Sequence, residues 1–331
     1  MSGVGNTLSA DRLKLDAGAE VERIDAFIRD GVFTRLRRKG LVIGLSGGID
    51  SSTVAALAVS ALGPDRVIGL FMPESDSSDD SLRLGQLLAK QLGIRTFTED
   101  ISGILSGAEC YRRRDAAIRE VVPEYHAGYK SKLVLSSLDS SEFRISYVVV
   151  QSPNGVQRKV RLTGDAFLAL VAATNFKQRT RKMMEYYYAD RFLYAVGGTP
   201  NRLEYDQGFF VKNGDGSADI KPIAHLYKSQ VYQLAAFLGV PDEILTRLPT
   251  TDTYSLSQSQ EEFYFSLPYE NMDLCLYGKN HNLPAKEVAK DLGLTEAQVE
   301  RVYRDIDAKR AVARYLLMEP LVAQSTGDTS V

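Results

Sequence analysis

Short apolar runs alternate with helix-like segments through the first hundred residues. Three runs have the length of buried strands: 41–45, 67–72 and 94–97. Three other segments show the spacing or composition of helices: 21–28, 53–62 and 81–92. The second of these helices is expected to stop at Gly63-Pro64 and the third at Gly93. Strands that alternate with helices in this way predict an α/β fold with a doubly wound parallel sheet.

The alternation breaks between about residues 100 and 163. Two apolar segments, 144–150 and 156–162, flank Ser152-Pro-Asn-Gly155, which is a typical hairpin turn. We therefore expect a β-hairpin insertion here. Four elements should follow: a helix over 165–190, a strand over 192–196, a helix over 227–238 and a helical C-terminal part from about 240 to 323. The prediction is a single domain over 1–323 and a flexible tail at 324–331.

The composition changes this picture little. Lys and Arg number 40 and Asp and Glu 42 in 331 residues, so the net charge is −2. Nucleic acids and anionic membranes usually require a basic excess, which this chain lacks. Cys110 and Cys275 are too far apart for a CxxC motif, and three scattered histidines do not predict a zinc site. Without a signal peptide or a run of about 20 apolar residues, we expect a cytoplasmic protein with no membrane segment.

The junction between the first strand and the next helix carries the strongest chemical signal. It reads Ser46-Gly-Gly-Ile-Asp-Ser-Ser52. Glycine allows phosphate to approach the backbone, serine hydroxyls donate hydrogen bonds, and the start of a helix attracts anions. Asp50 would repel phosphate unless a cation lay between them, so we assign it to Mg²⁺. A plain strand–helix turn with a serine cap is the alternative, but it would not need so many glycines, hydroxyls and an acid together.

This junction resembles the SGGxDS pyrophosphatase loop of enzymes that split ATP into AMP and pyrophosphate. It differs from the Walker A loop, because the chain contains no GxxxxGK[ST]. Later segments resemble ammonia-dependent NAD synthase in the right order: 73–81, 175–181, 198–204, 212–219, and the stretch from Lys228 to Thr250-Thr251. The resemblance covers most of the chain and implies a Rossmann-like fold of the adenine nucleotide alpha-hydrolase type. The segment 258–262 also resembles this family, but no role follows for it.

The resemblance implies roles for individual residues. For ATP it implies Ser46, Gly47, Gly48, Asp50, Ser51, Ser52, Thr199, Lys228 and Thr250. For the dinucleotide substrate it implies Asn175, Arg179, Arg181, Tyr186, Lys212, Asp215 and Asp219. Asp50 and Glu204 are implied as magnesium ligands, and Asp50 and Lys228 as the catalytic pair. Taken alone, the basic segment could be a solvated helix face, and Tyr186 could belong to the core.

The implied reaction is amidation of nicotinic acid adenine dinucleotide by ammonia, with ATP as co-substrate. The carboxylate would attack the α-phosphorus and release pyrophosphate, and ammonia would then displace AMP from the acyl-adenylate. The two cysteines lie in contexts unsuited to a glutaminase nucleophile. We therefore expect free ammonia or a separate glutaminase partner as the nitrogen source. The resemblance also implies a homodimer with the dinucleotide near its interface.

Three other functions fit parts of the sequence. The segment 284–302 resembles a DNA-binding helix-turn-helix, but 283–310 carries six basic and six acidic residues, so a packed helical hairpin is favoured. An amide synthetase acting on another carboxylate in a specialised biosynthetic pathway would explain two departures from short NAD synthases, the hairpin insertion and Pro200. A nucleotide-binding protein without turnover would not need Asp50, Glu204 and Asp215 together.

Overall fold

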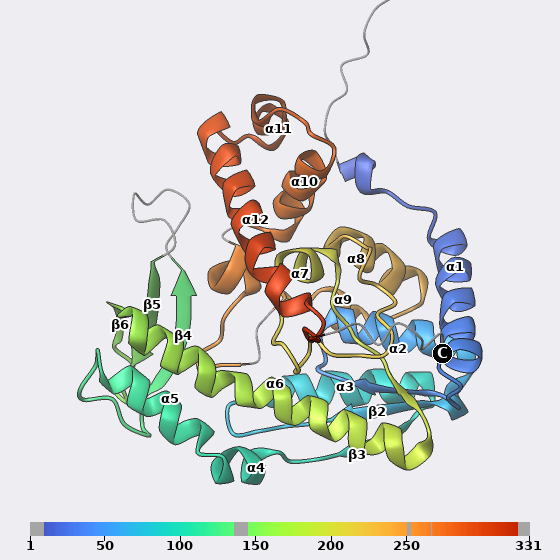
Figure 1. Cartoon of the computed structure of the whole chain (residues 1–331), viewed down its shortest axis with the longest axis horizontal. Helices are drawn as coiled ribbons and strands as arrows, with labels where there is room; N and C mark the ends of the chain where they lie inside the picture. The colour runs from blue at the N-terminus through green and yellow to red at the C-terminus, as the bar shows by residue number, and fades with distance from the viewer. Residues whose placement is uncertain (1–9, 136–144, 250–252, 266, 324–331) are drawn as a thin grey trace, which may run out of the picture.

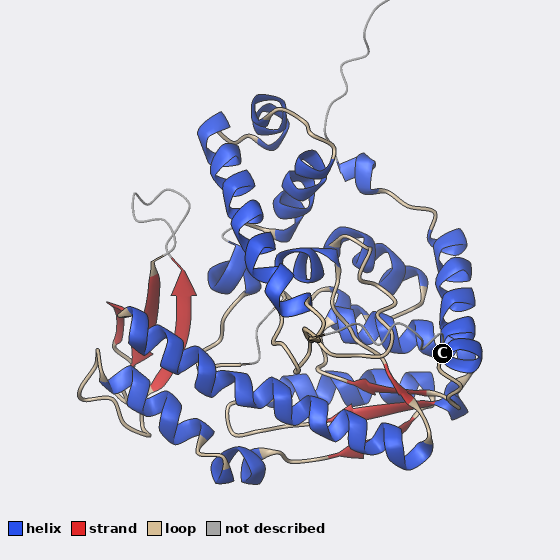
Figure 2. Cartoon of the chain, viewed as in Figure 1, coloured by secondary structure: helices blue, strands red, loops and turns tan. Residues whose placement is uncertain are grey.

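A computed structural model of the chain describes residues 10–135, 145–249, 253–265 and 267–323 (Figure 1). At its centre is a parallel sheet in the order β3-β2-β1-β7. Its strands are β1 (Leu41–Gly44), β2 (Val67–Phe71), β3 (Arg95–Thr98) and β7 (Ala195–Val196). Leu41 pairs with Val67 on one side and with Ala195 on the other. The structure confirms the predicted parallel α/β fold, and Figure 2 shows helices around the sheet.

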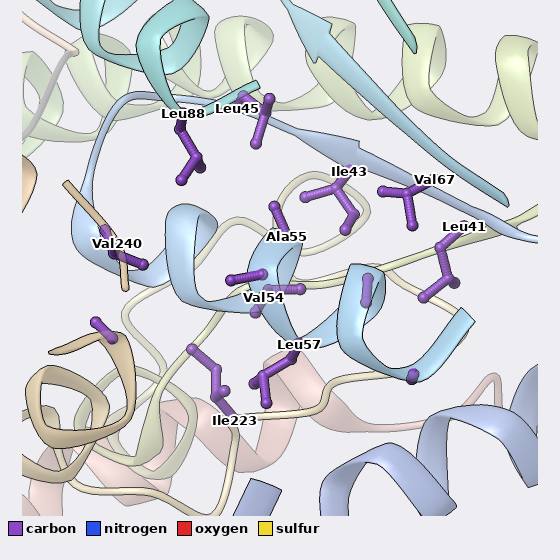
Figure 3. Close-up of a cluster of buried hydrophobic side chains, with 14 of the residues drawn as sticks. Leu41, Ile43, Leu45, Val54, Ala55, Leu57, Val67, Leu88, Ile223 and Val240 are labelled. Atoms are coloured by element: carbon purple, nitrogen blue, oxygen red, sulfur yellow. The ribbon is translucent and has the colours of Figure 1, made fainter. Parts of the chain in front are cut away.

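The central strand β1 is buried on both of its faces. Leu41 and Ile43 pack against a cluster formed with α1 (Ala17–Arg29), α2 (Ile49–Leu62), α3 (Asp79–Leu92) and α8 (Lys228–Phe237) (Figure 3). Val42 points to the opposite face, where Tyr188 and Ala189 of α6 (Gly164–Phe192) cover the sheet. A strand enclosed in this way needs apolar residues at successive positions, which explains the unbroken run in the sequence.

Two of the boundaries that differ from the prediction matter for the fold. The helix predicted from residue 53 begins at Ile49, so Asp50, Ser51 and Ser52 lie in its first turn. The strand predicted over 192–196 is reduced to Ala195–Val196, because α6 continues to Phe192 and ends at Leu193, which adopts a left-handed conformation with φ of 57°.

The region between β3 and α6 holds more structure than a hairpin. It contains α4 (Ser102–Gly107), α5 (Cys110–Arg119) and an antiparallel sheet in the order β4-β5-β6. The hairpin β5 (Ser146–Gln151) and β6 (Gln157–Arg161) is the one predicted, with Gly155 at φ of 82° in its turn. The strand β4 (Lys130–Leu135) and the two helices were not predicted. Figure 1 shows α6 running from this antiparallel sheet to the parallel one.

The C-terminal part is helical, as predicted. It consists of α9 (Asp242–Leu245), α10 (Tyr269–Asn280), α11 (Ala285–Leu292) and α12 (Glu296–Leu317). The segment resembling a helix-turn-helix is a hairpin of α11 and α12, whose Val288 and Val299 pack with Leu276 of α10. The remaining elements are α7 (Arg202–Gln207) and four short helices: η1 (Ala10–Leu13), η2 (Asp30–Arg35), η3 (Pro64–Arg66) and η4 (Glu261–Phe265). None of the helices in the described ranges has the length and apolar character required to cross a membrane. The predicted tail at 324–331 falls outside those ranges.

Candidate functional site

A cavity of about 780 Å³ opens at the carboxyl ends of β1 and β2 and follows α6. Gly44 and Phe71, at the ends of these strands, line it. Doubly wound sheets bind nucleotides at this edge. Further parts of the wall come from the glycine turn, the loop after β2, α6, α7, α12 and residues 247–249, 253–254, 260 and 263–264. The cavity therefore gathers most of the regions that carry the sequence motifs.

The glycine turn is held in shape by its own hydroxyl groups. The Oγ atoms of Ser46 and Ser51 lie 3.1 Å apart, and Ser51 Oγ donates to the carbonyl oxygen of Gly48 at 3.1 Å. Gly47 has φ of 71°, and a Cβ atom there would lie 2.4 Å from the carbonyl oxygen of Ser81. Glycine is therefore required at this position by both its backbone angle and its close neighbour.

Asp50 lies at the centre of a polar cluster at the start of α2. It forms an ion pair with Lys228, whose side chain is buried at the start of α8. Its Oδ1 accepts a hydrogen bond from Asn201 Nδ2 at 3.0 Å. Asn201 also caps α7, accepting from the N–H of Glu204 at 3.2 Å while Glu204 Oε2 accepts from the N–H of Asn201. One capping residue thus connects the two carboxylates implied as metal ligands.

The electrostatics of this cluster leave its carboxylates short of positive charge. Burial raises the pKa of Glu204 to about 8, and the charge of Asp50 contributes to the rise. Burial alone would lower the pKa of Lys228, but Asp50 and Glu204 outweigh it and hold that pKa above its ordinary value. Lys228 therefore stays protonated, and one ammonium group serves two carboxylates.

Lys228 is itself fixed by a buried acid on another helix. Asp273 of α10 accepts hydrogen bonds from the N–H groups of Lys228 at 3.1 Å and Ser229 at 2.7 Å. These are free donors at the start of α8, so Asp273 caps that helix. Burial raises the pKa of Asp273 to about 6.

Most of the residues predicted for ATP line the cavity: Ser46, Gly48, Asp50, Ser51, Thr199 and Lys228. Gly47 shapes the turn behind them, and Ser52 is buried in α2 with no hydrogen-bond partner for its hydroxyl. Pro200, the departure noted in the sequence, precedes the capping residue Asn201 and lies outside α7. Thr250 lies outside the described residues.

The residues predicted for the dinucleotide divide into two groups. Asn175, Arg181 and Asp215 line the cavity. Burial raises the pKa of Asp215, whose Oδ1 accepts from the N–H of Val211 at 2.8 Å.

The other group lies outside the cavity wall. Arg179 is exposed and donates from Nε to the carbonyl oxygen of Lys212 at 3.3 Å. Lys212 Nζ reaches the carbonyl oxygen of Tyr315 at the end of α12, at 3.0 Å. Tyr186 donates its hydroxyl to Asp219 Oδ1 at 3.2 Å, and Asp219 Oδ2 accepts from a backbone N–H of β7 at 2.7 Å. The structure therefore does not bring these four side chains to the cavity, and their substrate role remains a prediction.

Several polar residues of the cavity wall were missed in the sequence. Lys182 and Glu185 of α6 form a buried ion pair of 2.5 Å, and both line the cavity. Arg247 lines it as well and donates to Ser81 Oγ at 3.1 Å. Gln260 Nε2 donates to Glu204 Oε1 at 3.1 Å. The helical period could have revealed the pair on α6, because residues 178, 181, 182 and 185 share one face.

Comparisons with known proteins identify the relatives of this chain. A family model described as NAD synthase matches residues 20–152 and 156–312. The NH(3)-dependent NAD(+) synthetase of Mesorhizobium japonicum is 59% identical over 317 residues, which cover 96% of this chain and 99% of that protein. The protein of the same name from Rhizobium meliloti is also 59% identical, with 96% and 95% covered.

Two solved structures share the fold. The NMN synthetase from Francisella tularensis superimposes with a TM-score of 0.65 at 23% identity, covering 93% of this chain and 99% of that one. The NH3-dependent NAD synthetase from Campylobacter jejuni, in complex with the nitrate ion, gives a TM-score of 0.60 at 22% identity, covering 94% and 100%. At these identities the two structures support the fold alone.

Proposed function

The chain belongs to the NAD synthase family, and on that premise we propose that its cavity amidates nicotinic acid adenine dinucleotide to NAD with ammonia and ATP. The resemblance predicted from the motifs is thereby confirmed. One observation carries the proposal furthest: the glycine turn, the Asp50–Lys228 pair and Glu204 share a cavity with Asn175 and Arg181 of α6. A nucleotide phosphate and an acid substrate can therefore meet in one place.

The chemistry follows from a poor leaving group. A carboxylate does not react with ammonia, so one of its oxygens first bonds to the α-phosphorus of ATP while the bond to pyrophosphate breaks. Ammonia then bonds to the carbonyl carbon, loses a proton, and AMP leaves. The start of α2 binds phosphate, and the buried ammonium of Lys228 offsets the charge that builds on pyrophosphate. Asn201 keeps Asp50 oriented toward the same phosphates.

We propose Asp50 and Glu204 as the residues that hold Mg²⁺. Magnesium prefers oxygen ligands and is usually bound by one or two carboxylates, substrate phosphates and water. The raised pKa of Glu204 reflects a buried pair of acids that lacks positive charge, and a divalent cation would supply it. No group of three or more His, Cys, Asp or Glu side chains suited to a metal occurs within the described ranges, so phosphate oxygens would complete the shell. When bound, the ion would polarise the phosphates and neutralise the pyrophosphate.

Three further parts complete the proposal, and the first of them rests on family resemblance. The protein is a homodimer, and the dinucleotide extends toward the interface, where the exposed Arg179 could still contact it. Ammonia arrives free or from a separate glutaminase, since both cysteines are buried. Burial raises the pKa of Cys275 to about 12, so its thiol stays protonated and is a poor nucleophile for glutamine hydrolysis. The two cysteines are unpaired, in keeping with a cytoplasmic location.

The decisive experiment supplies the purified chain with Mg²⁺, ATP, ammonium and one acid at a time. With nicotinic acid adenine dinucleotide, we expect NAD, AMP and pyrophosphate in equal amounts. Asp50→Asn should abolish product formation, because it removes a proposed Mg²⁺ ligand and the charge that pairs with Lys228; circular dichroism of the variant checks that it still folds. Asp165→Asn is the matched control, since this acid is exposed in the first turn of α6.

The same assay separates the closest rival. Nicotinic acid mononucleotide and unrelated carboxylic acids form the other arms, the first because one fold relative is described as an NMN synthetase. If pyrophosphate is released with another acid and not with nicotinic acid adenine dinucleotide, the enzyme carries out the same reaction on a different substrate. Intact ATP in every arm would refute the proposed activity.

A further inference from the structure

The antiparallel sheet has an edge that is covered by a distant part of the chain. Its strand β4 pairs with β5 on one side only. On the other side lies the segment 253–258, more than a hundred residues later. Ser131 donates its N–H to Ser255 Oγ at 2.9 Å and accepts from the N–H of Leu256 at 3.1 Å. Two residues along the strand, the carbonyl oxygen of Leu133 accepts from Gln258 Nε2.

This pattern is that of an occupied strand edge. Backbone groups of alternate residues point to the same side of a strand, and Ser131 and Leu133 are such a pair. An unpaired strand edge exposes backbone N–H and C=O groups that can pair with another chain. The segment 253–258 uses these groups on β4, and this gives the segment a specific attachment to the sheet. The side chain of Gln258 is 1% exposed, and an amide so deeply buried is held by its hydrogen bonds.

The attached segment is also held at its start and by its side chains. Lys177 of α6 is fully buried and donates to the carbonyl oxygen of Thr253 at 2.7 Å. The side chain of Tyr254 enters the hydrophobic cluster that includes Leu133 and Val148 of the sheet. The sheet and α6 therefore fix residues 253–258 together.

The other end of the same segment reaches the functional site. Gln260 follows Gln258 by two residues and donates to Glu204 Oε1, the carboxylate that we propose as a metal ligand. Its N–H donates to the carbonyl oxygen of Pro249 at 3.3 Å. Leu133 itself lines the cavity, so the sheet and the site share a wall.

We propose that the antiparallel sheet is the anchor of the segment 253–260, and that Gln258 is a positioning residue for the Mg²⁺–ATP site. Gln258 locks the segment to β4, and this places Gln260 where it orients Glu204. The inference rests on the proposed function and extends it, because it gives the inserted sheet a part in nucleotide binding. The effect should appear in ATP affinity and not in the use of ammonia.

The test compares two glutamines of one sheet region. Gln258→Met keeps the side-chain volume and removes the hydrogen bond, whereas Gln157→Met alters an exposed residue of β6, at the opposite edge. For Gln258→Met we expect at least fivefold weaker binding of ATP in Mg²⁺ by calorimetry and a matching rise in KM for ATP. KM for ammonia should stay within twofold, and amide hydrogen exchange over 253–260 should accelerate. Gln157→Met should match the parent chain in all four measurements.

Two results would overturn the inference. Unchanged exchange over 253–260 in Gln258→Met would mean that the segment is not anchored through Gln258, and faster exchange with unchanged ATP affinity would mean that the anchor does not serve the site. If Gln258→Met fails to fold, Ser255→Ala removes the two hydrogen bonds between its hydroxyl and the backbone of Ser131 and should give a two- to threefold weaker affinity. Calorimetry with ATP needs no acid substrate, so a chain that binds ATP but forms no NAD would refute the proposed function and still decide this inference.

Discussion

Replacing the buried Lys177 should lower the free energy of unfolding by more than the loss of an exposed ion pair would. Lys177 is 0% exposed and its Nζ lies 2.9 Å from Glu74 Oε1, 2.6 Å from Asp76 Oδ2 and 2.7 Å from the carbonyl oxygen of Thr253. Lys177→Met fills similar volume and removes the charge. Asp76 keeps an ion pair with Arg114, but among the described residues Glu74 keeps only neutral donors, the Tyr111 hydroxyl and the N–H of Asp76.

The size of the effect follows from the carboxylate left behind. Removing one partner of a buried ion pair usually costs about 3–5 kcal/mol, because the remaining charge is neither solvated nor paired. Total stabilities are about 5–15 kcal/mol, so Lys177→Met should lose a large fraction of its free energy of unfolding. Adding Glu74→Gln removes the uncompensated charge and should restore at least half of the loss.

The assay is urea unfolding followed by circular dichroism for the parent, the single and the double variant. Lys279→Met is the matched control, since its ion pair with Asp307 is partly exposed and should contribute less than about 1 kcal/mol. A loss below about 1 kcal/mol for Lys177→Met would refute the reasoning. So would a double variant that is less stable than the single one.

Two further predictions concern the turn and a helix cap. Gly47→Ala combines φ of 71° with a contact of 2.4 Å to the Ser81 carbonyl oxygen, so it should weaken ATP binding at least tenfold in calorimetry; an unchanged affinity would show that the turn can relax. Burial raises the pKa of Asp273 to about 6. Between its ordinary pKa of about 4 and this value the native chain keeps a proton that the unfolded chain has lost, so stability falls as pH rises through that window. Asp273→Asn removes this titration, so from about pH 4 to pH 7 the difference in free energy of unfolding between variant and parent should shift by about 3 kcal/mol in favour of the variant; a shift under about 1 kcal/mol in urea unfolding would contradict this.

The parts of the fold that depend on local sequence could be predicted. β1 and β2 are buried on both faces, so their sequences are continuous apolar runs. Such runs can be identified without knowing which strands they pair with. The hairpin at Ser152-Pro-Asn-Gly155 encodes its own turn. The glycine turn and the Gly198–Glu204 loop are likewise short, and the structure places both at one cavity.

The parts that depend on distant contacts could not. β4 reads Lys-Ser-Lys-Leu-Val-Leu, and its outer edge is completed by residues 253–258, which no local pattern connects to it. The family resemblance of the segment 175–181 assigned Arg179 and Arg181 to the same substrate. Two residues along a helix rotate a side chain by about 200°, so the two guanidinium groups point in nearly opposite directions. Arg181 lines the cavity and Arg179 is exposed for this reason.

The pair of Lys228 and Asp50 explains why the net charge revealed so little about the site. A buried ion pair is a poor means of stabilising a fold, because its desolvation offsets most of its attraction. This pair is useful because Lys228 and Asp50 can each exchange the other for a new binding partner. In the proposed function, the phosphates of an entering nucleotide would compete for Lys228 and its metal ion would compete for Asp50, so each buried charge would gain a new partner as it left the old one. Such an exchange would leave neither of the two buried charges without a partner. If so, Lys228→Met combined with Asp50→Asn should fold as stably as the parent chain and bind ATP far more weakly.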